Sequence, residues 1–552
     1  MTNKAFANLF RELAKIMELH GENPFKIRSY QNAYINLRKL DQPVIDMDIT
    51  ELAAIKGIGK AISSKIREVS DTGKMETLEK YRLITPVGVR EMLNISGFGP
   101  KKIRTIWKDL HVETIGELLY AVNENRLIEL KGFGAKTQED LKVKLAYLQL
   151  SKGQFLYARA EQDAYEVIEQ LVGNFPTARI EFTGDFRRRC PTLANISILI
   201  AGAEAEPIKE LMNGTFTEGA NNVINALSSN GYPVTIYVCG KAEWGSKQFR
   251  YTASTAFMTA FIEVFPGVDF KQIEEEKSIF EKMKTDFLPA ELREDSWGLS
   301  LAQSKKVPIL IEENQIKGVI HTHTTYSDGV NSIEEMVSYA DELGYEYIGI
   351  TDHSKAAFYA GGLKEEAVLE QMAVIDALNE KQTKIRVLKG IESDILADGS
   401  LDYEEDILKQ FDFIIASIHS NLRMDEQKAT RRLIKAIENP YTSILGHPTG
   451  RLLLSRPGYP IDHQKIIDAC AANQVAIELN ANPLRLDLDW SWIPVALEKG
   501  VFISINPDAH SCKGIHDIHY GVLAARKGGL AENQCLNALN VELFMGKVHK
   551  WS

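Results

Sequence analysis

The sequence predicts a multidomain protein in which an all-α amino-terminal region precedes a carboxyl-terminal barrel of alternating strands and helices. A chain of 552 residues is too long for a single hydrophobic core, so several domains are expected. In the last 232 residues, short apolar runs such as YIGITDH, FDFIIASIH and VFISINPDAH each end on a histidine or a carboxylate. Apolar runs of this length are typical of buried parallel strands. In the first 150 residues, a Gly-x-Gly turn recurs three times between helical patterns.

Nine side chains with the chemistry of metal ligands follow the apolar runs. Because the carboxyl ends of barrel strands meet at one face, we expect these side chains in one crowded site. A lone histidine at a strand end is most often a core residue, but ten of the twelve histidines follow residue 320. Imidazole and carboxylate suit zinc, manganese and iron, so a multinuclear metal site is predicted, with Glu392 as the bridging carboxylate. The nine are His321, His323, Asp328, His353, Glu392, His419, His447, Asp508 and His510.

The segments that carry these residues resemble the PHP (polymerase and histidinol phosphatase) family over residues 315–552. They are HTHTTYSDG, ITDHS, GIESDILADGSLDY, SIHSN, LGHPTGRLL and NPDAH. The resemblance implies a distorted seven-stranded (β/α) barrel that holds three divalent ions, manganese or zinc. It further implies one ion on His321, His323, Glu392 and Asp508, a second on Glu392, His419 and His447, and a third on Asp328, His353 and His510.

Such a site has the chemistry to hydrolyse phosphoesters. Clustered divalent ions lower the pKa of a bound water and neutralise charge on the leaving group. We therefore expect catalytic roles for Glu392, Asp508 and His510. Arg451 is expected to bind phosphate oxygens, as is Arg456, although surface pairing with local carboxylates is an equal alternative for both. The mouth of the site is predicted to include Asn480, Asn482 and Arg485.

The three Gly-x-Gly turns resemble helix-hairpin-helix motifs, which bind DNA backbones without reading sequence. Glycine permits the tight turn, and the helix that follows presents backbone N–H groups to a phosphate. Lysines lie beside each turn and add positive charge. The expected DNA-binding residues are Gly57, Gly59, Lys60, Lys65, Gly97, Gly99, Lys101, Lys102, Gly132, Gly134 and Lys136.

The order of parts resembles the bacterial family X DNA polymerases that carry a PHP domain. The resemblance implies a small helix-hairpin-helix domain over residues 1–85 and a fingers-like region over residues 86–150. It implies an α/β nucleotidyltransferase-like palm and thumb over residues 151–300. The PHP domain is then expected over residues 315–552.

The palm motif departs from that family where the chemistry needs carboxylates. The segment TGDFRRRCPTLANISILIAG has Asn195 and Ser197 at two metal-binding Asp positions, and PVTIYVC has Thr235 at the third. Asp185 replaces the serine that would contact the triphosphate. Two-metal phosphoryl transfer needs carboxylates to hold Mg²⁺, so we expect that nucleotidyl transfer is lost.

Lys65 matches the lysine that some family X members use as a Schiff-base nucleophile on abasic sugars. A lysine acts in this way only when its pKa is depressed. Binding of the DNA backbone by Lys65 is the favoured alternative.

Charge is divided unevenly along the chain. Residues 1–150 hold 24 Lys and Arg against 19 Asp and Glu, a net +5, and the remainder carries −16. This division fits a DNA-binding arm joined to a metal enzyme, with single-stranded or gapped DNA as the expected partner.

The five cysteines lack a CxxC pair, and no signal peptide or membrane span is expected, which indicates a cytoplasmic protein. The sequence does not indicate an oligomeric state.

Together these features predict a metal-dependent DNA phosphodiesterase, a 3′→5′ exonuclease that acts in repair, with cleavage at abasic sites as a further possibility. One alternative is a phosphomonoesterase of the histidinol-phosphatase type, although such an enzyme needs no DNA-binding hairpins. Others are a DNA-binding scaffold without catalysis and a family X polymerase that is still active. The intact ligand set argues against the scaffold.

Overall fold

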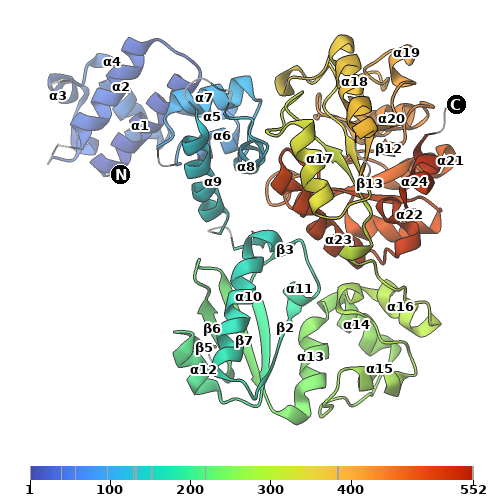
Figure 1. Cartoon of the computed structure of the whole chain (residues 1–552). Helices are drawn as coiled ribbons and strands as arrows, with labels where there is room; N and C mark the ends of the chain where they lie inside the picture. The colour runs from blue at the N-terminus through green and yellow to red at the C-terminus, as the bar shows by residue number, and fades with distance from the viewer. Residues whose placement is uncertain are drawn as a thin grey trace. The chain divides into compact units, whose positions relative to one another are not determined.

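The chain folds into two compact units, Met1–Tyr147 and Leu148–Ser552 (Figure 1). The structure is a computed structural model that describes residues 2–38, 40, 42–55, 57–95, 97–128, 130, 133–150, 153–217, 219–381 and 384–549. The expected all-α region, α/β palm and seven-stranded barrel are all present. The domain boundaries inside each unit remain predictions.

The first unit is helical. Its helices are α1 (Asn3–Leu19), α2 (Pro24–Leu37), α3 (Ile49–Ala54), α4 (Lys60–Thr72), α5 (Glu76–Ile84), α6 (Val87–Met92), α7 (Pro100–Asp109), α8 (Ile115–Asn123) and α9 (Ala135–Leu150), the last of which continues past the unit's end. Apolar side chains of α1, such as Phe6, Phe10 and Leu13, are fully buried. Helix α1 packs against α2, α5 and α7, so it forms the centre of the unit.

The first two Gly-x-Gly turns share one backbone geometry. Gly57 and Gly97 have φ angles of 85° and 84°, a left-handed conformation that favours glycine. Gly59 and Gly99 are the N-caps of α4 and α7, and neither helix has a side-chain cap. Backbone N–H groups at both helix starts are therefore available to an anion.

The palm-like part of the second unit is a five-stranded sheet in the order β2-β4-β7-β6-β5. Strand β4 (Ile196–Ala201) is buried along its whole length because helices α10 (Tyr157–Asn174) and α13 (Trp244–Thr252) both contact it. The remaining strands are β2 (Arg179–Thr183), β5 (Thr215–Thr217), β6 (Ala220–Leu227) and β7 (Pro233–Cys239). The short helix α11 (Gly184–Arg187) follows β2, and α12 (Ala205–Leu211) follows β4.

A phenylalanine-rich core joins α13 to the helices that follow the sheet. Phe249, Phe257, Phe261 and Phe280 are almost completely buried, and the ring of Phe249 contacts each of the other three edge to face. The helices are α14 (Thr255–Val264), α15 (Lys277–Met283) and α16 (Ser296–Ser304). This region lies where the sequence resembles a polymerase thumb.

The barrel is a parallel sheet of seven strands in sequence order. They are β8 (Gly318–Thr322), β9 (Tyr347–Ile350), β10 (Arg386–Asp394), β11 (Phe413–Ser417), β12 (Ile444–Leu445), β13 (Ala476–Asn480) and β14 (Ile503–Asn506). A parallel bridge between Thr322 and Ala509 brings the last strand back to the first, so the sheet nearly closes.

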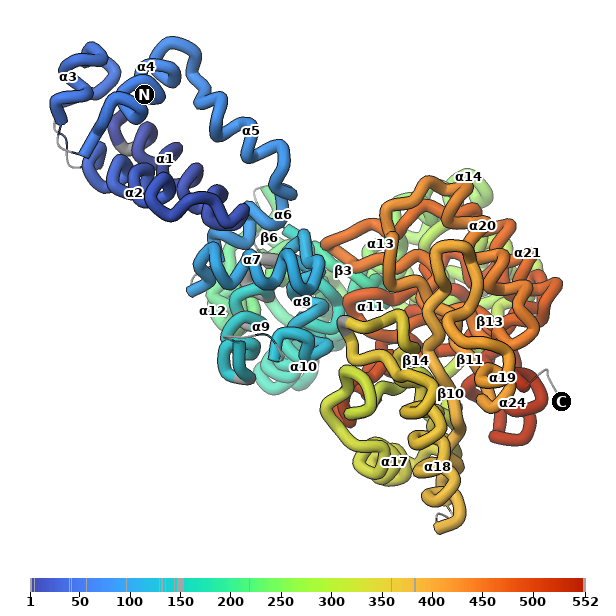
Figure 2. Tube along the Cα trace, turned by 90° about the horizontal axis from the view of Figure 1, so that it is seen from above, coloured from blue at the N-terminus to red at the C-terminus, as the bar shows by residue number. Residues whose placement is uncertain are grey.

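Helices cover the outside of the barrel, as in other (β/α) barrels. They are α17 (Ile333–Glu342), α18 (Glu365–Lys381), α19 (Glu405–Leu408), α20 (Glu426–Ile437), α21 (His463–Asn473), α22 (Ile493–Glu498) and α23 (Ile518–Lys527). The last helix, α24 (Val541–Val548), packs in a separate core with the strand residues Ile320, Tyr347 and Phe413. Helix α18 runs beside β10 (Figure 2).

Ion pairs connect the barrel to the palm within the second unit. Lys527 at the end of α23 is almost completely buried, and its Nζ lies 2.5 Å from Glu294 Oε1 and 2.9 Å from the carbonyl oxygen of Arg188. Arg526 pairs with Glu291 at 2.9 Å. Palm and barrel therefore share one polar interface.

The buried carboxylate Glu276 makes the stability of this unit depend on pH. Burial raises the pKa of Glu276, but Arg293 and Arg187 outweigh this effect and hold it at about 2. Because the folded-state pKa is depressed, the stabilisation is complete above pH 4.5 and is lost as pH falls toward 2, a total of about 3 kcal/mol. We expect Glu276→Gln to be less stable than wild type near neutral pH, with a difference that shrinks by roughly 2 kcal/mol by pH 3. Urea denaturation at several pH values measures this, and a difference independent of pH would contradict it.

Candidate metal centre

The nine predicted ligands meet at the carboxyl ends of the barrel strands. His321 is in β8 and Glu392 is in β10, and the other seven lie on the segments that immediately follow β8, β9, β11, β12 and β14. His321 and Asp508 have positive φ angles of 66° and 53°, uncommon for residues with a side chain. Strain of this kind clusters at functional sites.

Glu392 occupies the centre of the site. Its Oε1 lies 3.0 Å from Nε2 of His419, 3.0 Å from Nε2 of His447 and 3.2 Å from Nε2 of His321. Its Oε2 lies 2.9 Å from Nδ1 of His353. A carboxylate whose two oxygens face several imidazoles is placed to bridge metal ions.

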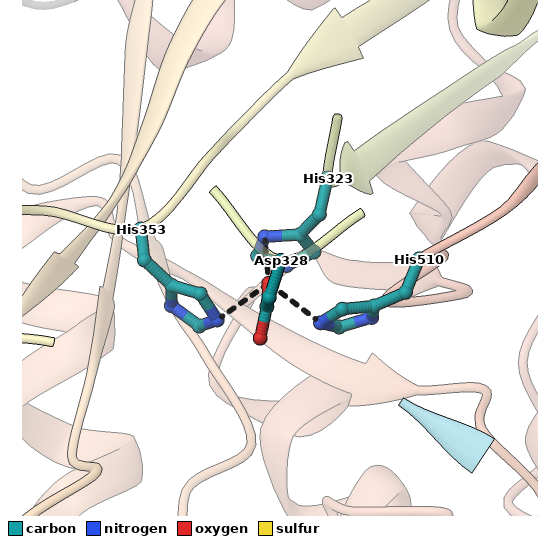
Figure 3. Close-up of side chains that lie close together, drawn as sticks. All are labelled: His323, Asp328, His353 and His510. Carbon is teal, nitrogen blue, oxygen red and sulfur yellow. Dashed lines mark ion pairs between the residues drawn. The ribbon is translucent and has the colours of Figure 1, made fainter. Parts of the chain in front are cut away.

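Asp328 is the centre of a second cluster. Its Oδ1 lies 3.2 Å from Nε2 of His510, 3.5 Å from Nε2 of His353 and 3.9 Å from Nδ1 of His323. The four side chains point toward one another (Figure 3). Their ligand atoms lie within 4.8 Å of each other, close enough to surround one ion.

Two further groups of ligand atoms have the same compactness. His321, His323 and Asp508 form one, and His353, Glu392 and His419 form the other. His323 and His353 thus each belong to two groups, whereas the family resemblance gives each to a single ion. His447 belongs to none of these groups, and it contacts Glu392 and the rings of His419 and His321. The division of the nine residues among ions remains a prediction.

The electrostatics of the site fit a bound cation. Burial lowers the pKa of His353, but Asp328 and Glu392 reverse this effect and raise it to about 10. Burial, His510 and His353 lower the pKa of His323 to about 4, so its imidazole is neutral. Buried atoms such as His321 Nε2 and Glu392 Oε2 have no hydrogen-bond partner among the described residues. The carboxylates thus favour added positive charge, and divalent ions would supply it while leaving neutral imidazoles as ligands.

Three carboxylates behind the ligands were not predicted from the sequence. Glu478 is fully buried, and its Oε1 lies 2.5 Å from Nδ1 of His321, while its Oε2 accepts the backbone N–H of His447 at 2.6 Å. Asp394 lies 3.1 Å from Nδ1 of His419. Asp352 accepts hydrogen bonds from Thr324 and Ser327, residues of the loop that carries Asp328, and from Gln371. The sequence holds a usable signal for two of them, because side chains two residues apart on a strand lie on the same face. Glu478 lies two residues before Asn480, and Asp394 lies two residues after Glu392.

The side chains predicted for the mouth of the site have different surroundings. Arg451 donates to the carbonyl oxygens of Arg485 and Leu486 and pairs with Asp489. This is the structural alternative of the sequence analysis, and phosphate binding by Arg451 remains a prediction. Asn480 Nδ2 donates to Asp508 at 3.0 Å, and Arg485 Nε is 3.9 Å from the same carboxylate, so both lie nearer the ligands.

Comparison with known proteins assigns the chain. The chain is 33% identical to the Bacillus subtilis protein named DNA polymerase/3′-5′ exonuclease PolX, over 99% of both chains. It belongs to the family X DNA polymerases that carry a PHP domain. Family profiles match a helix-hairpin-helix domain at residues 1–75, a SAM-like helix-hairpin-helix tandem at 89–146 and a PHP domain at 320–482.

Shorter relatives match a part of the chain. A probable phosphatase of Caldanaerobacter subterraneus is 32% identical over 35% of this chain and 75% of its own length. One from a Thermoanaerobacter species is 31% identical over 40% of this chain and 91% of its own length. PHP domains are metal-dependent phosphoesterases, so this family X protein has an enzyme domain of that class at its carboxyl-terminal end.

The three palm positions at which the sequence analysis predicts lost carboxylates lie together in this family X protein. Ser197 on β4 and Thr235 on β7 are direct partners across the parallel pair, and Asn195 accepts a hydrogen bond from Ser197 at 2.7 Å. All three side chains are uncharged, and their correspondence to the metal-binding positions of a polymerase remains a prediction. Among the described residues, no cluster with metal-ligand geometry lies in the palm.

Most of the predicted DNA-binding residues that the structure describes lie at or just before helix starts of the first unit, and Lys65 lies inside α4. Lys60, Lys101 and Lys136 are exposed within the first two residues of α4, α7 and α9. Lys65 donates to Thr77 Oγ1 at 2.5 Å. Lys102 lies over the rings of Phe98 and Phe133. Gly134 directly precedes α9, and Gly132 lies outside the residues that the structure describes.

Within the described part of the chain, no helix is long and apolar enough to span a membrane.

Proposed function

We propose that this protein is a 3′→5′ exonuclease on DNA in which the PHP barrel hydrolyses the phosphodiester and the hairpins and palm hold the strand. The complete nine-residue ligand set, with Glu392 at its centre, carries this proposal. The relative that matches the whole chain bears the name of an exonuclease as well as a polymerase. A role in DNA repair would use both activities of such an assembly, strand binding and end trimming.

The proposed cofactors are three manganese or zinc ions on the nine ligands. When bound, they would lower the pKa of a water and stabilise charge on the phosphoryl oxygens. Glu392 would be shared by two of the ions, and Asp328 and Asp508 would supply the remaining negative charge. Glu478 orients His321 so that Nε2 faces the centre, and Asp352 holds the loop of Asp328 in place. Arg485 is the cation best placed beside the ligands to orient a phosphate.

The palm is proposed to bind DNA without extending it. Primer extension tests this with the His321→Ala/His323→Ala variant, whose barrel would not degrade the primer. We expect no template-dependent product from Mg²⁺ or Mn²⁺ and nucleotides, because Asn195, Ser197 and Thr235 cannot hold the ions. The Bacillus subtilis relative, which is named a polymerase, is the positive control. Extension by this chain would disprove the loss of nucleotidyl transfer.

A second candidate function is hydrolysis of small phosphomonoesters. The observation that favours it is the match of 35% to 40% of the chain to proteins named probable phosphatases. Turnover of p-nitrophenyl phosphate and of single-stranded DNA, compared at the same enzyme concentration, separates the two.

Lyase activity of Lys65 on abasic DNA is tested by borohydride trapping. A covalent adduct that is undiminished in Lys65→Ala would exclude this residue as the nucleophile.

A further inference from the structure

We propose that the palm positions Arg485 beside the metal centre, so that the nuclease site depends on a platform from the polymerase part of the chain. The platform is the palm edge, which we define as residues 188–191. The inference rests on the proposed function, in which Arg485 orients a phosphate of the substrate. It gives the palm a task in the barrel that is separate from holding DNA and needs no metal-binding carboxylate.

The loop that follows β13 carries Arg485 to the ligands, and we call residues 482–489 the arginine loop. Arg485 is 5% exposed, and its Nε lies 3.9 Å from Oδ2 of Asp508. The backbone N–H groups of Arg485 and Leu486 donate to the carbonyl oxygen of Asn482 at 2.7 and 3.0 Å. Leu486 has a φ angle of 43°, which is strained for a bulky side chain. Such a conformation persists only where the surroundings hold it.

The palm supplies part of these surroundings. A cavity of about 10 Å³ separates the two parts, and the arginine loop lines it with Pro483 and Leu486 while the palm lines it with Tyr157, Arg189 and Pro191. A cavity needs ~10–15 Å³ to hold one water, so this one has no room for a ligand and marks a packed contact. The palm side is fixed, because Tyr157 is 4% exposed and accepts a hydrogen bond from Arg189.

Helix α23 holds the palm edge and the arginine loop at this spacing. Lys527, at the end of the helix, donates to the carbonyl oxygen of Arg188 in the palm edge at 2.9 Å. Gly521 lies so close to the barrel that a Cβ there would be 2.5 Å from the Cβ of Ala481, the residue before the arginine loop. The same helix therefore contacts the palm edge and the base of the loop.

The palm contact reaches the loop on both sides of Arg485. Pro483 lies two residues before it and Leu486 directly follows it, so movement of either changes the direction of the guanidinium. Misplacement of an orienting group by about 1 Å costs roughly 100-fold in rate. None of the nine metal ligands lies in the arginine loop. Loss of the palm contact should therefore lower turnover while the ions stay bound.

Turnover and amide hydrogen exchange of the full-length, manganese-loaded protein test this inference. Arg189→Ala/Pro191→Ala removes the contact from the palm edge, and Leu486→Ala removes it from the loop. We expect each to lower kcat/KM for bis(p-nitrophenyl) phosphate at least ~10-fold with metal content at the wild-type level. Exchange should rise in the arginine loop and stay unchanged in β10. Leu486→Met, which nearly conserves the volume, should behave as wild type.

A double-mutant cycle distinguishes positioning of Arg485 from a general loss of packing. In the Arg485→Ala background, Arg189→Ala/Pro191→Ala should cost less than about twofold in kcat/KM, because the side chain through which the palm acts is already absent. Pro176→Ala is the matched control, because this proline is exposed in the palm between α10 and β2. It should change neither turnover nor exchange.

Wild-type turnover in both Arg189→Ala/Pro191→Ala and Leu486→Ala would overturn the inference, and the nuclease assignment would stand without the platform. A palm-edge loss of the same size in the Arg485→Ala background would also overturn it, as would loss of the ions from the palm-edge variant. If exchange in the arginine loop rises in the variants but the wild type hydrolyses neither the diester nor DNA, the platform stands and the nuclease assignment fails.

Discussion

Replacement of Glu392 by glutamine is expected to remove phosphodiesterase activity and most of the bound metal. The carboxylate contacts imidazoles of His321, His353, His419 and His447 at 2.9 to 3.2 Å, so no other side chain connects as much of the site. Glutamine has nearly the same shape but no charge, and its amide N–H₂ would face imidazoles that need an acceptor or an ion. Loss of an outer partner costs ~10- to 100-fold, so loss of this central ligand should exceed 100-fold.

The measurement is turnover of bis(p-nitrophenyl) phosphate together with metal content by mass spectrometry. Glu438→Gln, at the exposed end of α20, is the matched control and should retain both. Circular dichroism reports whether the barrel stays folded. Full metal content with full activity in Glu392→Gln would show that the ions bind elsewhere.

Replacement of Glu478 by glutamine is expected to weaken metal binding although Glu478 is not among the predicted ligands. The carboxylate accepts hydrogen bonds from Asn506 at 2.8 Å and from the His447 backbone, and it faces Nδ1 of His321. Glutamine offers one acceptor oxygen, so its N–H₂ must face one of these donors. His321 would then lose the partner that keeps its proton on Nδ1 and its Nε2 directed at the centre.

The expected loss for Glu478→Gln is ~10- to 100-fold in metal affinity. Retention of metal during dialysis against a graded series of chelators measures it directly. Asp376→Asn, which removes an exposed carboxylate paired with Lys389, is the control. Metal affinity equal to wild type would mean that Glu478 only stabilises the barrel, and a shifted unfolding midpoint would then be its sole effect.

The convergence of the nine side chains could be predicted from the sequence because parallel strands place their carboxyl ends together. Which of these side chains bind the same ion could not be predicted. His323 and His353 each lie in two groups of ligand atoms, and this depends on the directions of their side chains. The positive φ angles at His321 and Asp508, which help to set those directions, leave no trace in a hydrophobic pattern. Glu478 was missed although it lies two residues before Asn480 on the same face of the strand, because it lies inside the apolar run and the ligands were sought at the strand ends.

The cations near the site show the same limit. Arg451 and Arg485 both follow strand ends in the sequence, yet Arg451 binds backbone carbonyls and Asp489 while Arg485 approaches Asp508. Sequence distance from a ligand does not tell where a long side chain points. In the palm, by contrast, the expected neighbours Ser197 and Thr235 are strand partners, because strand register places residues without reference to long side chains.

Cleavage of oligonucleotides labelled at the 3′ or the 5′ end, with manganese and without nucleotides, tests the central claim most directly. Wild type and His321→Ala/His323→Ala are compared. We predict that wild type releases the 3′ label at once and shortens the 5′-labelled strand stepwise, and that the double variant does neither. Cleavage that survives in the double variant, or no cleavage by wild type, would contradict a nuclease in the barrel.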